Sequence, residues 1–285
     1  MVTTASPYRE RREETAVGAD YVYRDALISA VASRSSEPDY TADSASLDVA
    51  QDLFGGMTTV NLGYSHGWDT VGKTRDPSFS KPADHWQYRL GATQILTPRW
   101  LMSLNFEAVA DNGFLASPYR AALVFGAAVP EVDPSTRTSR AATLRVAGSV
   151  GANGAVRAEY RYFWDTWDIH ARTTELGYSQ YVGKQWLVDG FGRYYSQTHA
   201  LFYSNDFTSE MTYMSRNRQL STFNDLGIGA KATYSIVREP ARYEIKGTAA
   251  FERLRFHYSD FTDVRTGGLY SFNANVLELF VTATF

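Results

Sequence analysis

Side chains that could perform acid–base or metal chemistry are scattered along this sequence. The chain has five histidines and no cysteine, which excludes disulfides, thiolate metal sites and cysteine nucleophiles. Several aspartates lie close to histidines in sequence, and carboxylate and imidazole groups together could bind a metal ion. No His-x-x-x-His spacing supports such a site, so we expect neither a metal nor a cofactor. The histidines are His66, His85, His170, His199 and His257.

Two short motifs resemble those of enzymes. GYSHG at residues 63–67 matches G-x-S-x-G, but no helical pattern follows Ser65, as a nucleophile elbow requires. GIGAKA at residues 227–232 lies within a predicted strand rather than before a helix, so it does not predict phosphate binding. Asp165, Asp168 and His170 are acid–base candidates without a convincing constellation. We therefore predict no catalytic residues and no enzyme.

Strands must position these residues, because polar and apolar side chains alternate along most of the chain. From residue 155 the sequence reads AVRAEYRYFWDTW, in which Arg157, Glu159 and Arg161 alternate with apolar residues. This period of two is typical of a strand with two different faces. Several such segments run about 11–15 residues, and a tilted strand that crosses a bilayer needs about 9–11.

Thirteen strands are predicted, and they indicate an all-β fold, an antiparallel transmembrane β-barrel. Residues 1–285 would form one outer-membrane barrel domain. No run of about 18 apolar residues indicates a transmembrane helix. The predicted strands are 13–22, 26–35, 42–52, 57–67, 85–96, 100–110, 139–150, 154–166, 169–181, 185–199, 222–236, 242–257 and 269–285.

The predicted connections alternate between short turns and mostly longer loops, as periplasmic turns and extracellular loops do in outer-membrane barrels. The long loops are 67–84, 111–138, 200–221 and 259–268. An apolar segment at 121–129 inside one of them is either an extra strand or a plug. Aromatic residues near strand ends, such as Trp86, Trp164, Trp167 and Trp186, predict two interfacial girdles.

The number of predicted strands determines on which side of the membrane the N-terminal end would lie. Bacterial single-chain barrels have an even number of strands with both ends in the periplasm, whereas thirteen strands would start outside. The first residues also lack the apolar core of a signal peptide. We therefore expect that the signal peptide and at least one N-terminal strand are missing, and that the full-length barrel has about 14–16 strands.

Charged residues on the inward face are the main candidates for function. An arginine or lysine facing lipid would cost about 2–4 kcal/mol at the bilayer midplane, so the lumen is either wet or filled with ion pairs. Both signs of charge occur, so no ion selectivity follows. The predicted lumen-lining residues are Arg89, Glu107, Arg145, Arg157, Glu159, Arg161, Lys231, Glu244, Lys246 and Glu278.

The last strand ends in NVLELFVTATF, in which apolar residues alternate up to a terminal aromatic. This pattern resembles the signal read by the outer-membrane barrel assembly machinery, which would then be a partner together with outer-membrane lipids. The assembly-signal residues are Leu277, Leu279, Val281, Ala283 and Phe285. The net charge of −3 gives no basic excess, so we expect no nucleic acid partner.

Several segments are similar to the bacterial family catalogued as domain of unknown function 3570. They are VTTASPYRE, QDLFGGMTTVNLGYSHGWDTVG, YRLGATQILTPRWLM, DNGFLASPYR and AEYRYFWDTWDI. The resemblance covers essentially the whole chain and implies an N-terminally truncated outer-membrane barrel. It also implies periplasmic or lipoprotein partners of an envelope redox system, although no residue here carries that implication.

The sequence therefore predicts a Gram-negative outer-membrane barrel of unspecified role. A porin-like pore for a small solute and a scaffold of an envelope complex are the leading interpretations. A barrel enzyme and a receptor or adhesin acting through its long loops are the alternatives. The remaining alternative is a soluble β protein.

Overall fold

The computed structural model describes residues 11–239 and 243–284. In this part of the chain, 13 antiparallel strands form one sheet in the order of the sequence, and β7 with β8 forms a separate hairpin. Among the residues described, no helix has the length and apolar character to cross a membrane. The sheet strands are β1 (Glu13–Tyr23), β2 (Ala26–Glu37), β3 (Tyr40–Leu53), β4 (Thr58–Gly72), β5 (Ser80–Thr97), β6 (Trp100–Gly113), β9 (Thr136–Val150), β10 (Gly154–Asp165), β11 (His170–Val182), β12 (Trp186–Gln197), β13 (Phe223–Glu239), β14 (Tyr243–Thr262) and β15 (Leu269–Thr284).

The thirteen predicted strands are confirmed, and several extend beyond the predicted ends, three of them furthest. β4 continues to Gly72, β5 begins at Ser80 and β14 continues to Thr262. These extensions mix polar residues with a few apolar ones, such as Val71 and Phe261, and carry no sustained alternation, but backbone pairing needs no apolar side chain. The strands therefore reach further towards the long connections than hydrophobic periodicity shows.

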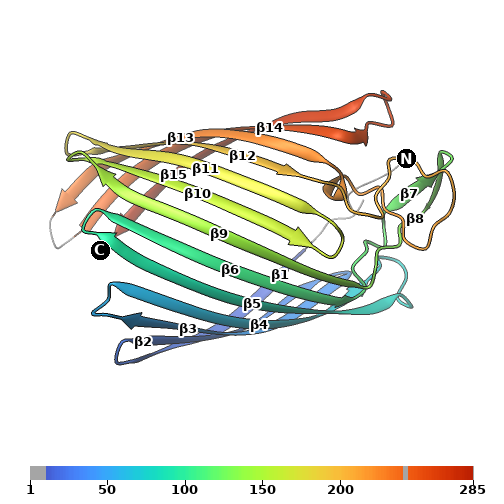
Figure 1. Ribbon diagram of the computed structural model, residues 1–285, viewed down its shortest axis with the longest axis horizontal. Helices are drawn as coiled ribbons and strands as arrows, with labels where there is room; N and C mark the ends of the chain where they lie inside the picture. The colour runs from blue at the N-terminus through green and yellow to red at the C-terminus, as the bar shows by residue number, and fades with distance from the viewer. Residues whose placement is uncertain (1–10, 240–242, 285) are drawn as a thin grey trace.

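Figure 1 shows the strands rolled around a common axis, with short turns at one end and the long connections with β7 and β8 at the other. The tight turns use residues in the left-handed region, such as Gly151 at φ 64° and Gly183 at φ 63°. Glycine adopts this conformation without the steric cost that a Cβ brings. We call the two ends the turn end and the loop end.

The outward face of the sheet exposes its large apolar side chains. Leu62, Leu176 and Leu277 are 62%, 61% and 69% exposed, respectively. Water would disfavour such a surface by about 25 cal/mol per Å² of apolar area. A wide belt of this kind is what a lipid-facing barrel surface requires.

The buried apolar clusters lie at the loop end rather than beneath the sheet. One contains Trp167, Ile169, Phe202 and Leu220, among others. Trp167 is thus buried under the loops instead of lying in an aromatic girdle, which corrects the expectation from its position at a strand end.

The second cluster settles the role of the apolar segment at 121–129. β7 (Ala121–Val124) and β8 (Ala127–Pro130) form a hairpin outside the main sheet, and Ala122 and Val124 pack against Phe207 and Met214. Residues 114–135 and 198–222 therefore fold together over the loop end, and we call them the cap.

Candidate binding vestibule

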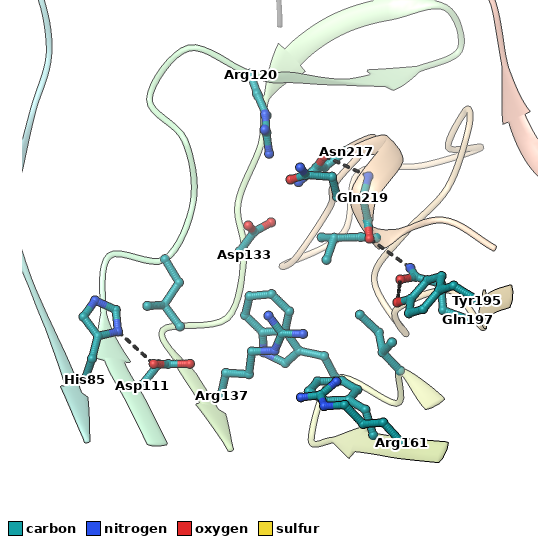
Figure 2. Close-up of a pocket in the computed structure, with 15 residues that line it drawn as sticks. His85, Asp111, Arg120, Asp133, Arg137, Arg161, Tyr195, Gln197, Asn217 and Gln219 are labelled. Carbon is teal, nitrogen blue, oxygen red and sulfur yellow. Dashed lines mark hydrogen bonds and ion pairs between the residues drawn. The ribbon is translucent and has the colours of Figure 1, made fainter. Parts of the chain in front are cut away.

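A cavity of about 440 Å³ lies between the cap and the loop ends of the strands (Figure 2). Its walls come from β5, β6, β9, β10 and β12, from the β10–β11 turn and from both halves of the cap. We call this cavity the vestibule and the face of the sheet that lines it the inner face. The lining residues are His85, Asp111, Leu115, Arg120, Asp133, Arg137, Arg161, Phe163, Trp167, Ile169, Tyr195, Gln197, Asn217, Gln219 and Leu220.

Arg137 is held on the floor of the vestibule by a buried carboxylate. Its Nε donates to Asp165 Oδ2 over 2.8 Å, and its guanidinium lies 4.5 Å from the Trp167 ring centroid. The other oxygen of Asp165 accepts the backbone N–H groups of Trp167 and Ile169, at 3.0 and 2.9 Å. Asp165 thus organises the β10–β11 turn and orients Arg137 at once.

Two further arginines border the same space. Arg161 on β10 lies 3.7 Å from Glu107, a separation too long for a strong hydrogen bond. Arg120 projects from the cap (Figure 2), and its guanidinium forms neither a hydrogen bond nor an ion pair with the described residues. Both side chains therefore keep N–H donors available to a ligand.

Asp133 is the carboxyl group that faces these cations from the cap. Burial, and secondarily the charge of Glu131, raise the pKa of Asp133 to about 7. Its Oδ1 atom is buried and has no hydrogen-bond partner among the described residues. The charge of the vestibule therefore changes close to neutral pH.

His85 connects the vestibule to a neighbouring cavity of about 580 Å³. Its Nδ1 lies 2.8 Å from Asp111 and its Nε2 lies 3.1 Å from Asp69, and Asp69 also accepts a hydrogen bond from Tyr40. Asp111 is thereby engaged by His85, so its charge is partly compensated.

Hydrogen bonds join the two halves of the cap. Phe125 and Val132 donate backbone N–H groups to Phe207 and Met214, over 2.9 and 3.0 Å. Arg216 is buried, and its guanidinium donates to the backbone oxygens of Asn205 and Thr262 over 2.8 and 2.7 Å. The vestibule is therefore roofed by a folded structure rather than by loose loops.

All ten charged residues expected in the lumen lie on the inner face by strand register. Most of them form ion pairs that cross between strands: Arg89–Asp48, Arg161–Glu107, Arg145–Glu159, Arg157–Glu175 and Lys231–Asp189. Lys246 pairs with Glu244 along β14, and Glu278 borders a cavity of about 300 Å³ with Arg157 and Lys231. Whether this face conducts stays a prediction.

Gly63 makes the ion pair between Arg89 and Asp48 possible. Arg89 lies on β5 and Asp48 on β3, so the pair must cross β4, and the hydrogen bonds between them measure 2.8 Å. A Cβ on Gly63 would stand 2.3 Å from Asp48 Oδ1 and 2.8 Å from Arg89 Nε. The missing side chain is the space that the ion pair occupies.

Sequence reasoning missed part of the vestibule. Arg137 lies two residues before the predicted start of its strand, while Arg120, Asp133 and Asn217 lie in connections without periodicity. Asp189 and Arg193 could have been found, because they share the parity of the other inward residues and pair with Lys231 and Asp225.

The enzyme-like motifs have structural roles. Ser65 lies inside β4 and bonds Gln87 on the inner face, while His66 on the outward face contacts Asp84. GIGAKA lies inside β13, where Gly229 leaves room for the Phe191 ring.

The other histidines are also dispersed. His170 lies 3.6 Å from Asp168 on the outward side, and His199 contacts Asp260. Within residues 11–239 and 243–284 no group of three potential metal ligands converges.

The predicted assembly-signal residues Leu277, Leu279, Val281 and Ala283 lie on the outward face of β15. Phe285, the VTTASPYRE segment at 2–10 and part of the predicted turn at 238–241 lie outside the described residues.

Comparison with solved structures shows the fold of outer-membrane β-barrels. The siderophore receptor PirA from Pseudomonas aeruginosa is similar with a TM-score of 0.58 and 10% identity, over 95% of this chain and 55% of the receptor. Its namesake from Acinetobacter baumannii gives 0.56 and 11%, over 95% and 48%. The chain thus spans about half the length of these receptors.

No curated protein sequence matches the chain. A family model described as "Protein of unknown function (DUF3570)" matches residues 73–245. Because the match covers more than half of the sequence, this chain belongs to the DUF3570 family, as its motifs predict.

Proposed function

We propose that this protein is an outer-membrane β-barrel that binds a small anionic solute in the vestibule and passes it along the inner face. The observation that carries the proposal is the convergence of Arg120, Arg137 and Arg161 on one cavity. Guanidinium groups bind carboxylates and phosphates through directed, charge-assisted hydrogen bonds. Asp111 and Asp133 oppose them, but His85 engages the first, and the raised pKa of the second lets it lose its charge.

Further cavities support passage beyond the vestibule. One of about 220 Å³ shares Arg161 with the vestibule and continues towards Arg89 and Asp48. Its walls are mainly polar or small, which suits a hydrated solute. The siderophore receptors with a similar fold contribute only the fold to this argument.

The membrane location is part of the proposal. The exposed apolar belt supports contact with outer-membrane lipids, and the alternating end of β15 supports recognition by the barrel assembly machinery. Separation of envelope fractions from cells that express the full-length protein tests this part. Recovery in the aqueous fraction without detergent would remove both the location and the transport role.

A binding and conductance experiment tests the solute. We expect the purified full-length protein to bind citrate or inositol phosphates, and Arg120→Gln with Arg161→Gln to weaken binding about tenfold or more. Arg99→Gln with Lys184→Gln, in two turns at the turn end, is the matched loss of two positive charges. In planar bilayers we expect anion-selective conductance, and equal binding by all variants would contradict the vestibule as the site.

A scaffold role is the second candidate, because ion pairs such as Arg145–Glu159 and Lys231–Asp189 occupy the inner face. It predicts membrane insertion with conductance near zero and recovery of envelope proteins by affinity purification. Periplasmic or lipoprotein partners of a redox system would be identified in the same experiment.

A further inference from the structure

Charges on the outward face of the sheet are distributed unevenly. Among the strand side chains that the structure describes, three carboxylates point outward, and each is paired: Glu13 with Arg11, Asp43 with Arg34 and Asp84 with His66. Among strand residues whose side chains the structure describes, the outward charges left without a partner are all arginine. They are Arg140, Arg172, Arg253 and Arg255.

These four arginines all lie in the loop-end half of their strands. Arg140 is near the start of β9 and Arg172 near the start of β11, while Arg253 and Arg255 lie towards the loop end of β14. Nearer the turn end, the same faces continue with the exposed apolar residues Leu144, Leu176 and Phe251. Cationic groups thus lie at the border of the apolar belt that is nearer the loop end.

Aromatic rings fill the space between Arg140 and Arg172. Arg140 is the cross-strand neighbour of Trp164, and Arg172 is that of Tyr162. The two rings stack with centroids 5.5 Å apart, and Tyr162 also bonds His170 over 3.1 Å. Neighbouring strands are about 4.8 Å apart, and the partners of the two arginines are two residues apart on β10, so the arginine backbones are separated by roughly 12 Å.

We propose that this outward surface binds the phosphate groups of lipid headgroups in the membrane leaflet on the loop side. A cation facing lipid is costly, and the cost is relieved at the headgroup level by an anionic partner. Arginine provides directed donors for phosphate, and tyrosine and tryptophan are favoured at that depth. Asp168, in the adjoining β10–β11 turn, lies 3.6 Å from His170 and forms no ion pair with either arginine. The inference rests on the membrane location proposed above.

The test measures lipid retention by the full-length protein purified in detergent. Native mass spectrometry with diphosphoryl lipid A as the probe would compare the wild type with the quadruple Gln variant at positions 140, 172, 253 and 255. We expect a loss of affinity of about tenfold or more. Fully dephosphorylated lipid A should bind the wild type as weakly as diphosphoryl lipid A binds the quadruple variant, and millimolar inorganic phosphate should compete only weakly.

The control removes the same number of charges from paired or inward positions, with Arg34, Arg145, Arg157 and Arg193 changed to Gln. Resistance of the folded barrel to SDS at room temperature confirms that each variant folds. If the quadruple variant does not fold, the double variants Arg140→Gln with Arg172→Gln and Arg253→Gln with Arg255→Gln are tested separately. Equal retention of lipid A by the outward variant and the wild type would overturn the inference. Loss of the protein from the membrane fraction would instead overturn the proposed function, whereas anion binding in the vestibule is expected to be unchanged by the outward variant.

Discussion

Asp133 connects the charge of the vestibule to pH. Its pKa of about 7 lies far above the ordinary value of 3.8 because burial disfavours the carboxylate. Between these two values the folded protein binds more protons than the unfolded chain, so the contribution of Asp133 to cap stability falls as pH rises from about 4 to 7.

Anion binding should follow the same titration. Protonation of Asp133 removes a negative charge beside Arg120, so we expect affinity for an anionic solute to increase by about three- to tenfold from pH 8 to pH 6. Asp133→Asn should bind with the higher affinity at both values. Calorimetric titration measures this, and an unchanged pH dependence in Asp133→Asn would assign the effect to another group.

Gly63 offers a second test at the scale of single residues. Gly63→Val would place carbon atoms where Asp48 and Arg89 now meet, so the ion pair must open and Arg89 must move. We expect altered conductance and a loss of stability of about 1–3 kcal/mol. Asn61→Val, at the next inward position of β4, is the control. Equal unfolding midpoints for the two variants would show that the Arg89–Asp48 ion pair does not need the space at Gly63.

At the scale of elements, the cap is held by a small number of buried groups. Arg216 bonds Asn205 and Thr262 and stacks on Phe261 with 4.6 Å between its guanidinium and the ring centroid. Removing it leaves several acceptors unsatisfied, each at a cost of about 1–3 kcal/mol.

We therefore expect Arg216→Ala to open the cap while the strands stay paired. Hydrogen exchange should accelerate across residues 114–135 and 198–222 and stay slow in β9 to β12. Arg218→Ala, in the same connection, is the control, because the Arg218 guanidinium lies 5.8 Å from the Tyr270 and Phe272 ring centroids and donates no hydrogen bond to the described residues of the cap. Exchange that accelerates equally in the sheet would mean that the cap and the barrel unfold together.

Strands and cap differ in how far their sequence predicts them. A strand with an apolar outward face and polar contacts on the inner face must alternate, so β10 and β13 are visible in the sequence. The cap depends on contacts between residues about 80 positions apart, such as Phe125 with Phe207, and local patterns contain no trace of them. The ten inward charges were placed by parity, whereas Arg120 and Asp133 enter the vestibule only through the folding of the cap.

At the scale of the whole molecule, the buried clusters and the exposed belt are arranged inversely to those of a water-soluble protein. A soluble sheet protein packs its apolar face against a second layer. Here the apolar face of β11 is open, with Leu176 at 61% exposure.

An outward charge at that position should therefore be costly. We expect Leu176→Arg to reduce the free energy of unfolding in lipid by about 2–4 kcal/mol, with Leu176→Met close to the wild type. Urea titration in vesicles, followed by tryptophan fluorescence, measures the difference. If the two variants had the same midpoint, the face would not contact acyl chains.

The union of two distant connections in one cap has a consequence for biogenesis. Residues 114–135 emerge before β9, but their partners at 198–222 exist only after β12, and Thr262 completes the anchoring of Arg216. The cap can therefore fold only late in synthesis and assembly. Until then the vestibule is accessible from the loop end, and in the finished protein the cap covers it. A protease added at successive times after a radioactive pulse would date this step by the moment when cleavage near residue 125 ceases.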